Sequence, residues 1–167
     1  MRGKVLLMMA GAVLAMTAWA RVGETPDETE VRYGTPLDSH PGLYSNTMVR
    51  TYSRAGILVE ATFFMSNSGK SIVGEITYSL PYPTGQSNEL TKVVLLKLLD
   101  ANAAGQRWDM QANRPDTQEY SRPGATATVA PDLLTITLDE YAAFAAAEKT
   151  RLIAEQLDRI ESHIRDF

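Results

Sequence analysis

The stretch MVRTYSRAGILVEATFFM, residues 48–65, contains two segments separated by Ala55-Gly56, in which alternate side chains share a face. From Ile57 to Met65 an apolar residue occupies every second position, which is the period of a β-strand. Ala55-Gly56 is a typical hairpin turn, and the alternation resumes over residues 71–80 after a loop rich in Ser and Asn. We therefore predict a three-stranded antiparallel meander over residues 47–80.

An internal repeat begins inside this stretch. Tyr52-Ser53-Arg54-Ala55-Gly56 recurs 68 residues later as Tyr120-Ser121-Arg122-Pro123-Gly124, within a second, weaker meander predicted over residues 118–138. The same offset carries Gly34 onto Asn102, and we expect both to end helices, because Gly and Asn tolerate the left-handed conformation. Self-similarity at a fixed period indicates a repeated structural unit.

Three helices are predicted, the first and the last from capping signals and the second from its apolar residues. Thr25 to Glu28 forms a capping-box pattern with proline at the first helical position, and we expect Val31 and Tyr33 to hold this short helix in place. The second helix, about residues 88–101, is apolar nearly all round and should be the centre of the core. A second capping pattern, over residues 137–140, starts a helix that runs to about residue 166.

Together these elements predict an α+β domain with two tandem helix-plus-antiparallel-β-meander units and a long C-terminal helix. Unit one covers about residues 23–80, unit two about residues 87–138, and the helix about residues 139–166. Within these units, Asp38–Gly42 is interpreted as a polar turn and Trp108–Pro115 as irregular.

Residues 1–20 have the pattern of a cleavable signal peptide. Arg2 and Lys4 precede an apolar run that ends in Ala18-Trp19-Ala20, so we expect cleavage after Ala20 and a periplasmic or secreted domain of residues 21–167. Removing Arg2 and Lys4 from a chain of 16 basic and 20 acidic residues leaves a net charge of −6, which argues against nucleic-acid binding. No stable membrane insertion is expected after cleavage. The chain has no cysteine, hence no disulfide and no attachment point for an N-terminal lipid.

A family resemblance covers residues 23–54. Gly23-x-Thr25, followed by Val31, Tyr33 and the run Gly34-Thr35-Pro36-Leu37, resembles the small envelope proteins of the SmpA/OmlA (BamE-like) type and the tandem-repeat β-lactamase inhibitor proteins. The resemblance implies a short capped helix, a β-meander and binding to other proteins. The SmpA/OmlA lipoproteins carry a lipidated cysteine that this chain lacks, so only the fold is carried over.

Catalytic groups are sparse. His40 and His163 are the only histidines, no nucleophile–base motif occurs, and we expect no catalytic residue, metal or cofactor. Two alternatives to a binding role remain open. One is a carboxylate-dependent hydrolase that would use Asp109, Asp116 and Glu119. The other is a small-ligand carrier built around Tyr78, Tyr82 and Trp108.

The favoured function is a protein-interaction module whose partner is another envelope protein or a second copy of the chain. Candidate binding residues are the hairpin-tip arginines Arg54 and Arg122, and Leu58 and Phe64 on the outer face of their strand. On the C-terminal helix, apolar residues are spaced four, three, four and three apart, as in a heptad repeat; they are Ile153, Leu157, Ile160, Ile164 and Phe167. Either this helix docks on its own sheet, or these residues meet a partner.

Overall fold

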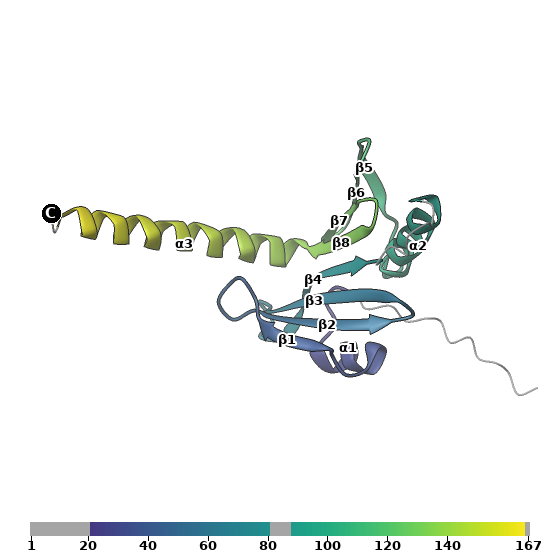
Figure 1. Cartoon of the computed structure of the whole chain (residues 1–167), viewed down its shortest axis with the longest axis horizontal. Coiled ribbons are helices and arrows are strands. Elements are labelled where there is room, and N and C mark those ends of the chain that lie inside the picture. The colour runs from purple at the N-terminus through teal and green to yellow at the C-terminus, as the bar shows by residue number, and fades with distance from the viewer. Residues whose placement is uncertain (1–20, 81–87, 166–167) are drawn as a thin grey trace, which may run out of the picture.

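The structure is a computed structural model, and it describes residues 21–80 and 88–165. It contains one eight-stranded antiparallel sheet and three helices, α1 (Pro26–Tyr33), α2 (Asn88–Ala101) and α3 (Asp139–Arg165) (Figure 1). The predicted α+β class with a long C-terminal helix is confirmed. The predicted signal peptide, Tyr82 and Phe167 lie outside the described residues.

The sheet joins two four-stranded meanders through the central pair β4–β8, in the order β1-β2-β3-β4-β8-β7-β6-β5. In that pair Glu75 lies opposite Thr137 and Tyr78 lies opposite Leu134. The strands are β1 (Asp38–Pro41), β2 (Met48–Arg54), β3 (Ile57–Met65), β4 (Ser71–Ser79), β5 (Asp109–Asn113), β6 (Gln118–Arg122), β7 (Ala125–Val129) and β8 (Leu133–Leu138).

Two of these strands correct the sequence interpretation. Asp38–Pro41 is strand β1 rather than a polar turn, and Asp109–Asn113 is strand β5 rather than irregular chain, so each meander has four strands and not three. Both are edge strands whose side chains are almost all exposed. An exposed edge strand needs no apolar alternation, since backbone hydrogen bonds to its one neighbour hold it.

The two hairpins that carry the repeated sequence have the same register. Tyr52 lies opposite Val59 and Tyr120 opposite Ala127, again 68 residues apart in both strands. Gly34 and Asn102 each directly follow the last residue of a helix, Tyr33 of α1 and Ala101 of α2, as expected. Their conformations differ, since Gly34 has a φ of 84° whereas Asn102 is not among the residues with positive φ, so only the left-handed conformation predicted for Asn102 is wrong. The division into two tandem units stays a prediction.

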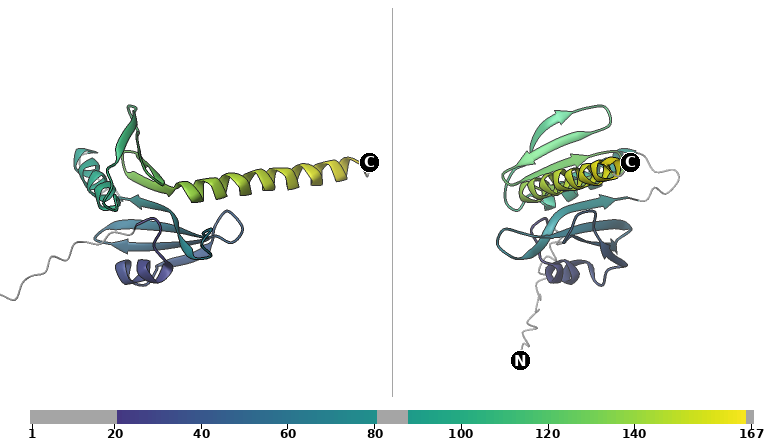
Figure 2. Two further views of the ribbon diagram at one scale, coloured as in Figure 1. Left: turned by 180° about the vertical axis from the view of Figure 1, so that it is seen from behind. Right: turned by 90° about the vertical axis from the view of Figure 1, so that its left-hand side faces the viewer.

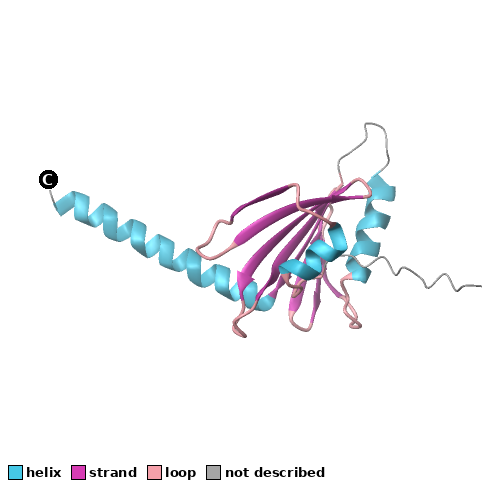
Figure 3. Ribbon diagram, turned by 90° about the horizontal axis from the view of Figure 1, so that it is seen from below, coloured by secondary structure: helices cyan, strands magenta, loops and turns pink. Residues whose placement is uncertain are grey.

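Helices α1 and α2 cover the same face of the sheet and share one hydrophobic core (Figure 3). α1 packs on β2 and β4, and α2 packs on β7 and β8. The largest fully buried side chains of this core are Tyr52, Phe63, Ile76, Tyr78, Leu95, Leu98, Leu134 and Ile136.

Two expectations about the helices are wrong. Val31 is 91% exposed and does not hold α1, whereas Tyr33 is buried as expected, together with Thr29, because the helix turns that side of its surface to the sheet. α2 buries one face rather than nearly all of its surface, since Leu95, Leu98 and Leu99 are buried while Val93 is 49% exposed. The capping box of Thr25 and Glu28 is present as predicted.

The other face of the sheet receives the start of α3, which then leaves the body of the molecule (Figure 2). An aromatic cluster fixes this start: the Phe64 ring centroid lies 5.2 Å from that of Tyr141 and 5.6 Å from that of Phe144, and Tyr44 contacts Phe144 edge-on. A β-bulge makes room for the cluster. Thr62 pairs with Glu75 and Phe63 with Val73, which leaves Gly74 without an opposite residue.

We expect Gly74→Ala to lower the free energy of unfolding by about 1–3 kcal/mol, because the added Cβ overpacks the cluster. At Gly74 a Cβ would lie 2.5 Å from Tyr141 Cγ and 2.7 Å from Phe64 Cδ1. Urea unfolding measures the loss. Adding Tyr141→Ala, which removes the nearer of the two obstructing rings, should make the double variant more stable than the sum of the two single losses predicts. Strict additivity would contradict this account.

Candidate interaction surfaces

The outer face of the sheet is the side away from α1 and α2. Its side chains are the ones that alternate with core residues along each strand, and most are hydroxyls and carboxylates. Thr77 and Thr135 are within 3.3 Å across the β4–β8 pair, and Thr137 Oγ1 donates to Glu75 Oε2 at 3.0 Å. The outward residues of these strands are Leu58, Glu60, Thr62, Phe64, Ile72, Glu75, Thr77, Ser79, Glu119, Ser121, Thr126, Thr128, Leu133, Thr135 and Thr137.

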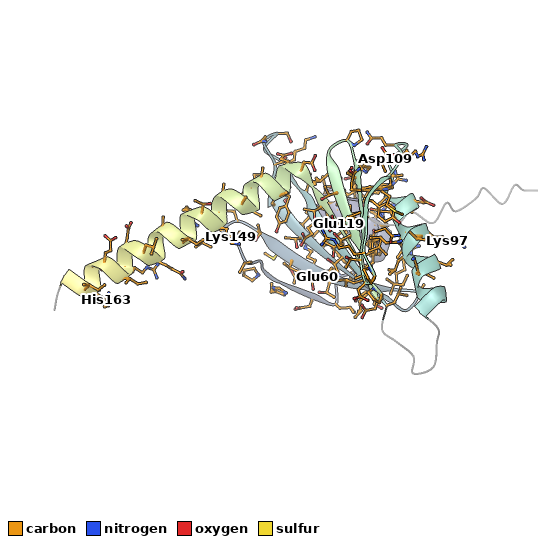
Figure 4. The ribbon with its side chains drawn as sticks, turned by 90° about the horizontal axis from the view of Figure 1, so that it is seen from above. Glu60, Lys97, Asp109, Glu119, Lys149 and His163 are labelled. Atoms are coloured by element: carbon orange, nitrogen blue, oxygen red, sulfur yellow. The ribbon has the colours of Figure 1, made fainter. Side chains whose placement is uncertain are left out.

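This face is acidic. Glu60 on β3 and Glu119 on β6 mark its two halves (Figure 4), and Glu75 lies between them on β4. Glu119 has Arg114 Nη2 at 3.5 Å, whereas Glu60 forms no ion pair with any residue that the structure describes. The strand arginines lie on the helix side: Arg50 pairs with Glu30 of α1 and stacks over the Phe63 ring at 5.5 Å. The sequence pattern predicts this outer face as a binding surface through Leu58 and Phe64, but Glu60, Glu75 and Glu119 were not among the predicted binding residues, although they occupy the polar positions between apolar ones in their strands.

The structure separates the two outer-face candidates. Leu58 is 38% exposed and lies on the outer face as predicted. Phe64 is only 2% exposed, since Tyr141 and Phe144 at the start of α3 cover it. Its prediction as a binding residue is therefore wrong, because α3 of the same chain covers the surface that a partner would need to contact.

Arg54 and Arg122 lie at hairpin ends, but both are engaged within the chain on the helix side of the sheet. Arg54 Nη1 donates to the carbonyl oxygen of Arg32 at the end of α1. The Arg122 guanidinium lies 5.0 Å from the centroid of the Trp108 ring and donates to Gln106 Oε1 at 3.3 Å, and its burial lowers its pKa. Neither arginine shares a surface with Leu58, so the structure does not bring these candidates together.

The first half of α3 is anchored to the body by one face. Burial of Tyr141 against the sheet raises its pKa to about 12. Nearly three turns later, Arg151 Nη2 donates to Glu148 Oε2 at 2.9 Å and to Ser45 Oγ, in the β1–β2 loop, at 3.1 Å. The hydrogen bond from Arg151 also lowers the pKa of Glu148. Beyond this contact the helix projects away from the sheet (Figures 1 and 2).

The four described candidates on α3 form what we call the α3 seam: Ile153, Leu157, Ile160 and Ile164. They are 50%, 55%, 56% and 68% exposed, respectively. At about 100° per residue, the seam lies roughly 120–180° around the helix from Glu148, on the side opposite the anchored face. The helix does dock on its own sheet at its start, but it does so through Tyr141 and Phe144. The seam itself stays uncovered by any described residue of the chain.

The residues predicted for the two alternative functions, hydrolase and small-ligand carrier, have other roles in the structure. Asp109 lies 3.7 Å from Arg107, and Asp116 lines a separate pocket of about 230 Å³ near the β5–β6 turn with Lys92 and Arg114. Tyr78 is fully buried and accepts a hydrogen bond from Asn102, which places it in the core rather than in a ligand cavity.

Trp108 likewise has a packing role, since its indole Nε1 donates to the Leu99 carbonyl at 2.9 Å. Within the described residues no cluster of His, Cys, Asp and Glu could hold a metal ion, and no helix is long and apolar enough to cross a membrane. Comparisons of the chain with protein-family models, with curated proteins and with solved structures found no match. The resemblance to BamE-like and β-lactamase-inhibitor proteins therefore stays a prediction.

Proposed function

We propose that this protein is an exported, non-catalytic interaction module that binds a basic segment of another envelope protein through the outer face of its sheet. The observation that carries the proposal is the contrast between the two faces. One is buried under α1 and α2, whereas the other is open, hydroxylated and acidic beyond the start of α3. Sheets whose two faces differ in this way commonly keep the polar face in contact with water or a partner.

Charge selects the class of partner. Glu60, Glu75 and Glu119 face outward from three strands, and the arginines of the neighbouring strands lie on the opposite side. A partner that presents lysine or arginine is attracted to such a surface, and the hydroxyls around the carboxylates supply further donors and acceptors. Leu58 adds an apolar contact beside Glu60.

The proposed export fits the way the described chain begins. Gly23 N donates to the Val73 carbonyl and Val73 N donates to the Glu24 carbonyl, both at 2.7 Å, and Val22 is buried in the core. Cleavage after Ala20 would leave all of these contacts in the mature chain. The signal peptide and the periplasmic or secreted location rest on the sequence pattern of residues 1–20.

We expect the double variant Glu60→Lys/Glu119→Lys to lose at least about tenfold in crosslinking to its envelope partner, because like charges would then face each other. The experiment is crosslinking in the native envelope with mass identification, comparing partner yield between variants at equal protein level. The recovered chain should begin at Arg21.

Asp100→Lys is the matched control. It reverses one acidic side chain, where the double variant reverses two, and does so at the C-terminal end of α2 on the covered side of the sheet, where a lysine suits the helix dipole. It should keep the wild-type crosslinking yield. Equal losses in the control and the double variant, or no loss in either, would contradict the proposed surface.

A further inference from the structure

We infer that the α3 seam is a homodimer interface, in which α3 of one protomer pairs antiparallel with α3 of a second copy. This surface is distinct from the outer face of the sheet. The inference goes beyond the proposed function and does not depend on it.

The seam continues toward the start of α3 as small residues. Ala146 and Thr150 precede Ile153 at the same heptad positions, both exposed and on the side away from the body. The Thr150 hydroxyl already donates to the Ala146 carbonyl at 2.9 Å, so its burial leaves no unpaired donor. The seam therefore changes from small side chains near the body to large ones at the free end.

This gradient makes the seam complementary to an inverted copy of itself. In an antiparallel pair one register places Ala146 against Ile164 of the partner subunit, Thr150 against the partner's Ile160, and Ile153 against the partner's Leu157. Each layer then combines a small with a large side chain or two of similar size, over residues 146–164, about 28 Å of helix. A parallel pair would stack alanine on alanine at one end and isoleucine on isoleucine at the other, so the two helices would have to be closer together at one end than at the other.

Charge favours the same arrangement. On the two edges of the seam, next to the two-fold axis, Ala154 lies opposite Ala154 of the partner subunit and Gln156 lies opposite the partner's Gln156. Neither residue is charged, so no like charges meet there. The bodies, with a mature net charge of −6 each, lie at opposite ends of the helix pair. That separation exceeds the Debye length of about 8 Å at physiological ionic strength, so their repulsion is screened.

The first test is the mass of the mature chain in solution across a micromolar dilution series, by analytical ultracentrifugation. We expect a dimer that dissociates on dilution, and we expect Ile160→Asp to weaken association by about 100-fold or more, because it buries an unpaired charge at the interface twice. Ser162→Asp, which adds the same charge on the same turn but on another face, should dimerise like the wild type. A wild-type chain that is monomeric throughout, or equal effects of the two substitutions, overturns the inference.

The second test fixes the orientation, and the absence of native cysteine makes it clean. A mixture of Ala146→Cys and Ile164→Cys chains should form a mixed disulfide under mild oxidation. Ile164→Cys alone should stay reduced, and a disulfide between two Ile164→Cys chains would overturn the antiparallel arrangement. Glu60→Lys/Glu119→Lys should dimerise normally, which separates failure of this inference from failure of the proposed function.

Discussion

Replacing Phe64 with alanine should lower the free energy of unfolding by about 3–5 kcal/mol, the usual cost of emptying a large buried aromatic site. Phe64 is 2% exposed and contacts both Tyr141 and Phe144, so its removal opens a cavity at the point where α3 joins the sheet. Chemical denaturation followed by circular dichroism measures the loss. Helix α3 should also become more accessible to protease.

Leu58→Ala is the matched control, because Leu58 lies on the same strand and the same face but is 38% exposed. We expect it to cost less than about 1 kcal/mol, since an exposed side chain loses little on truncation. Similar losses for the two variants, or a Phe64→Ala variant as stable as the wild type, would show that α3 does not cover Phe64 in solution.

This pair of residues shows how far sequence reasoning reaches. Strand alternation correctly assigns Leu58 and Phe64 to one face, because that depends only on local geometry. Whether the face is covered at a given point depends on Tyr141 and Phe144, nearly 80 residues later in the chain. Nothing local to Phe64 encodes that contact, so the candidate binding residue turned out to be a buried one.

The same distinction runs through the fold. Strands β2 to β4 and β6 to β8 and all three helices follow from periodicity and caps, and they lie close to their predicted bounds. The edge strands β1 and β5 carry no such pattern, since one neighbouring strand holds them through the backbone. The sequence also predicts the heptad-like spacing of the α3 seam, but it does not predict whether the seam faces the body of the molecule or solvent. Only the anchoring through Tyr141 and Arg151 shows that the seam points away from the body.

Asn102 illustrates a residue whose role the sequence misassigns. It follows the last residue of α2 as the sequence predicts, but without the predicted positive φ, and its side chain lies fully buried in the core. Its Nδ2 donates to Tyr78 Oη at 2.9 Å and to the Leu98 carbonyl at 2.8 Å. These bonds tie the end of α2 to β4, whereas the packing of α2 is mainly on β7 and β8. Asn102 is thus a polar link between the two halves of the sheet.

We expect Asn102→Ala to lower the free energy of unfolding by about 2–3 kcal/mol, through two lost buried hydrogen bonds and a cavity. The amide oxygen of Asn102 has no hydrogen-bond partner among the described residues, which keeps the loss below that of Phe64→Ala. Tyr78→Phe removes the acceptor of the bond from Asn102, together with the hydrogen bond between the Tyr78 and Tyr33 side chains, and should cost about 1–2 kcal/mol. Because the two changes break the same bond, the double variant should lose less than the sum of the singles in urea unfolding. Additive losses would mean that Asn102 stabilises α2 alone and does not couple it to β4.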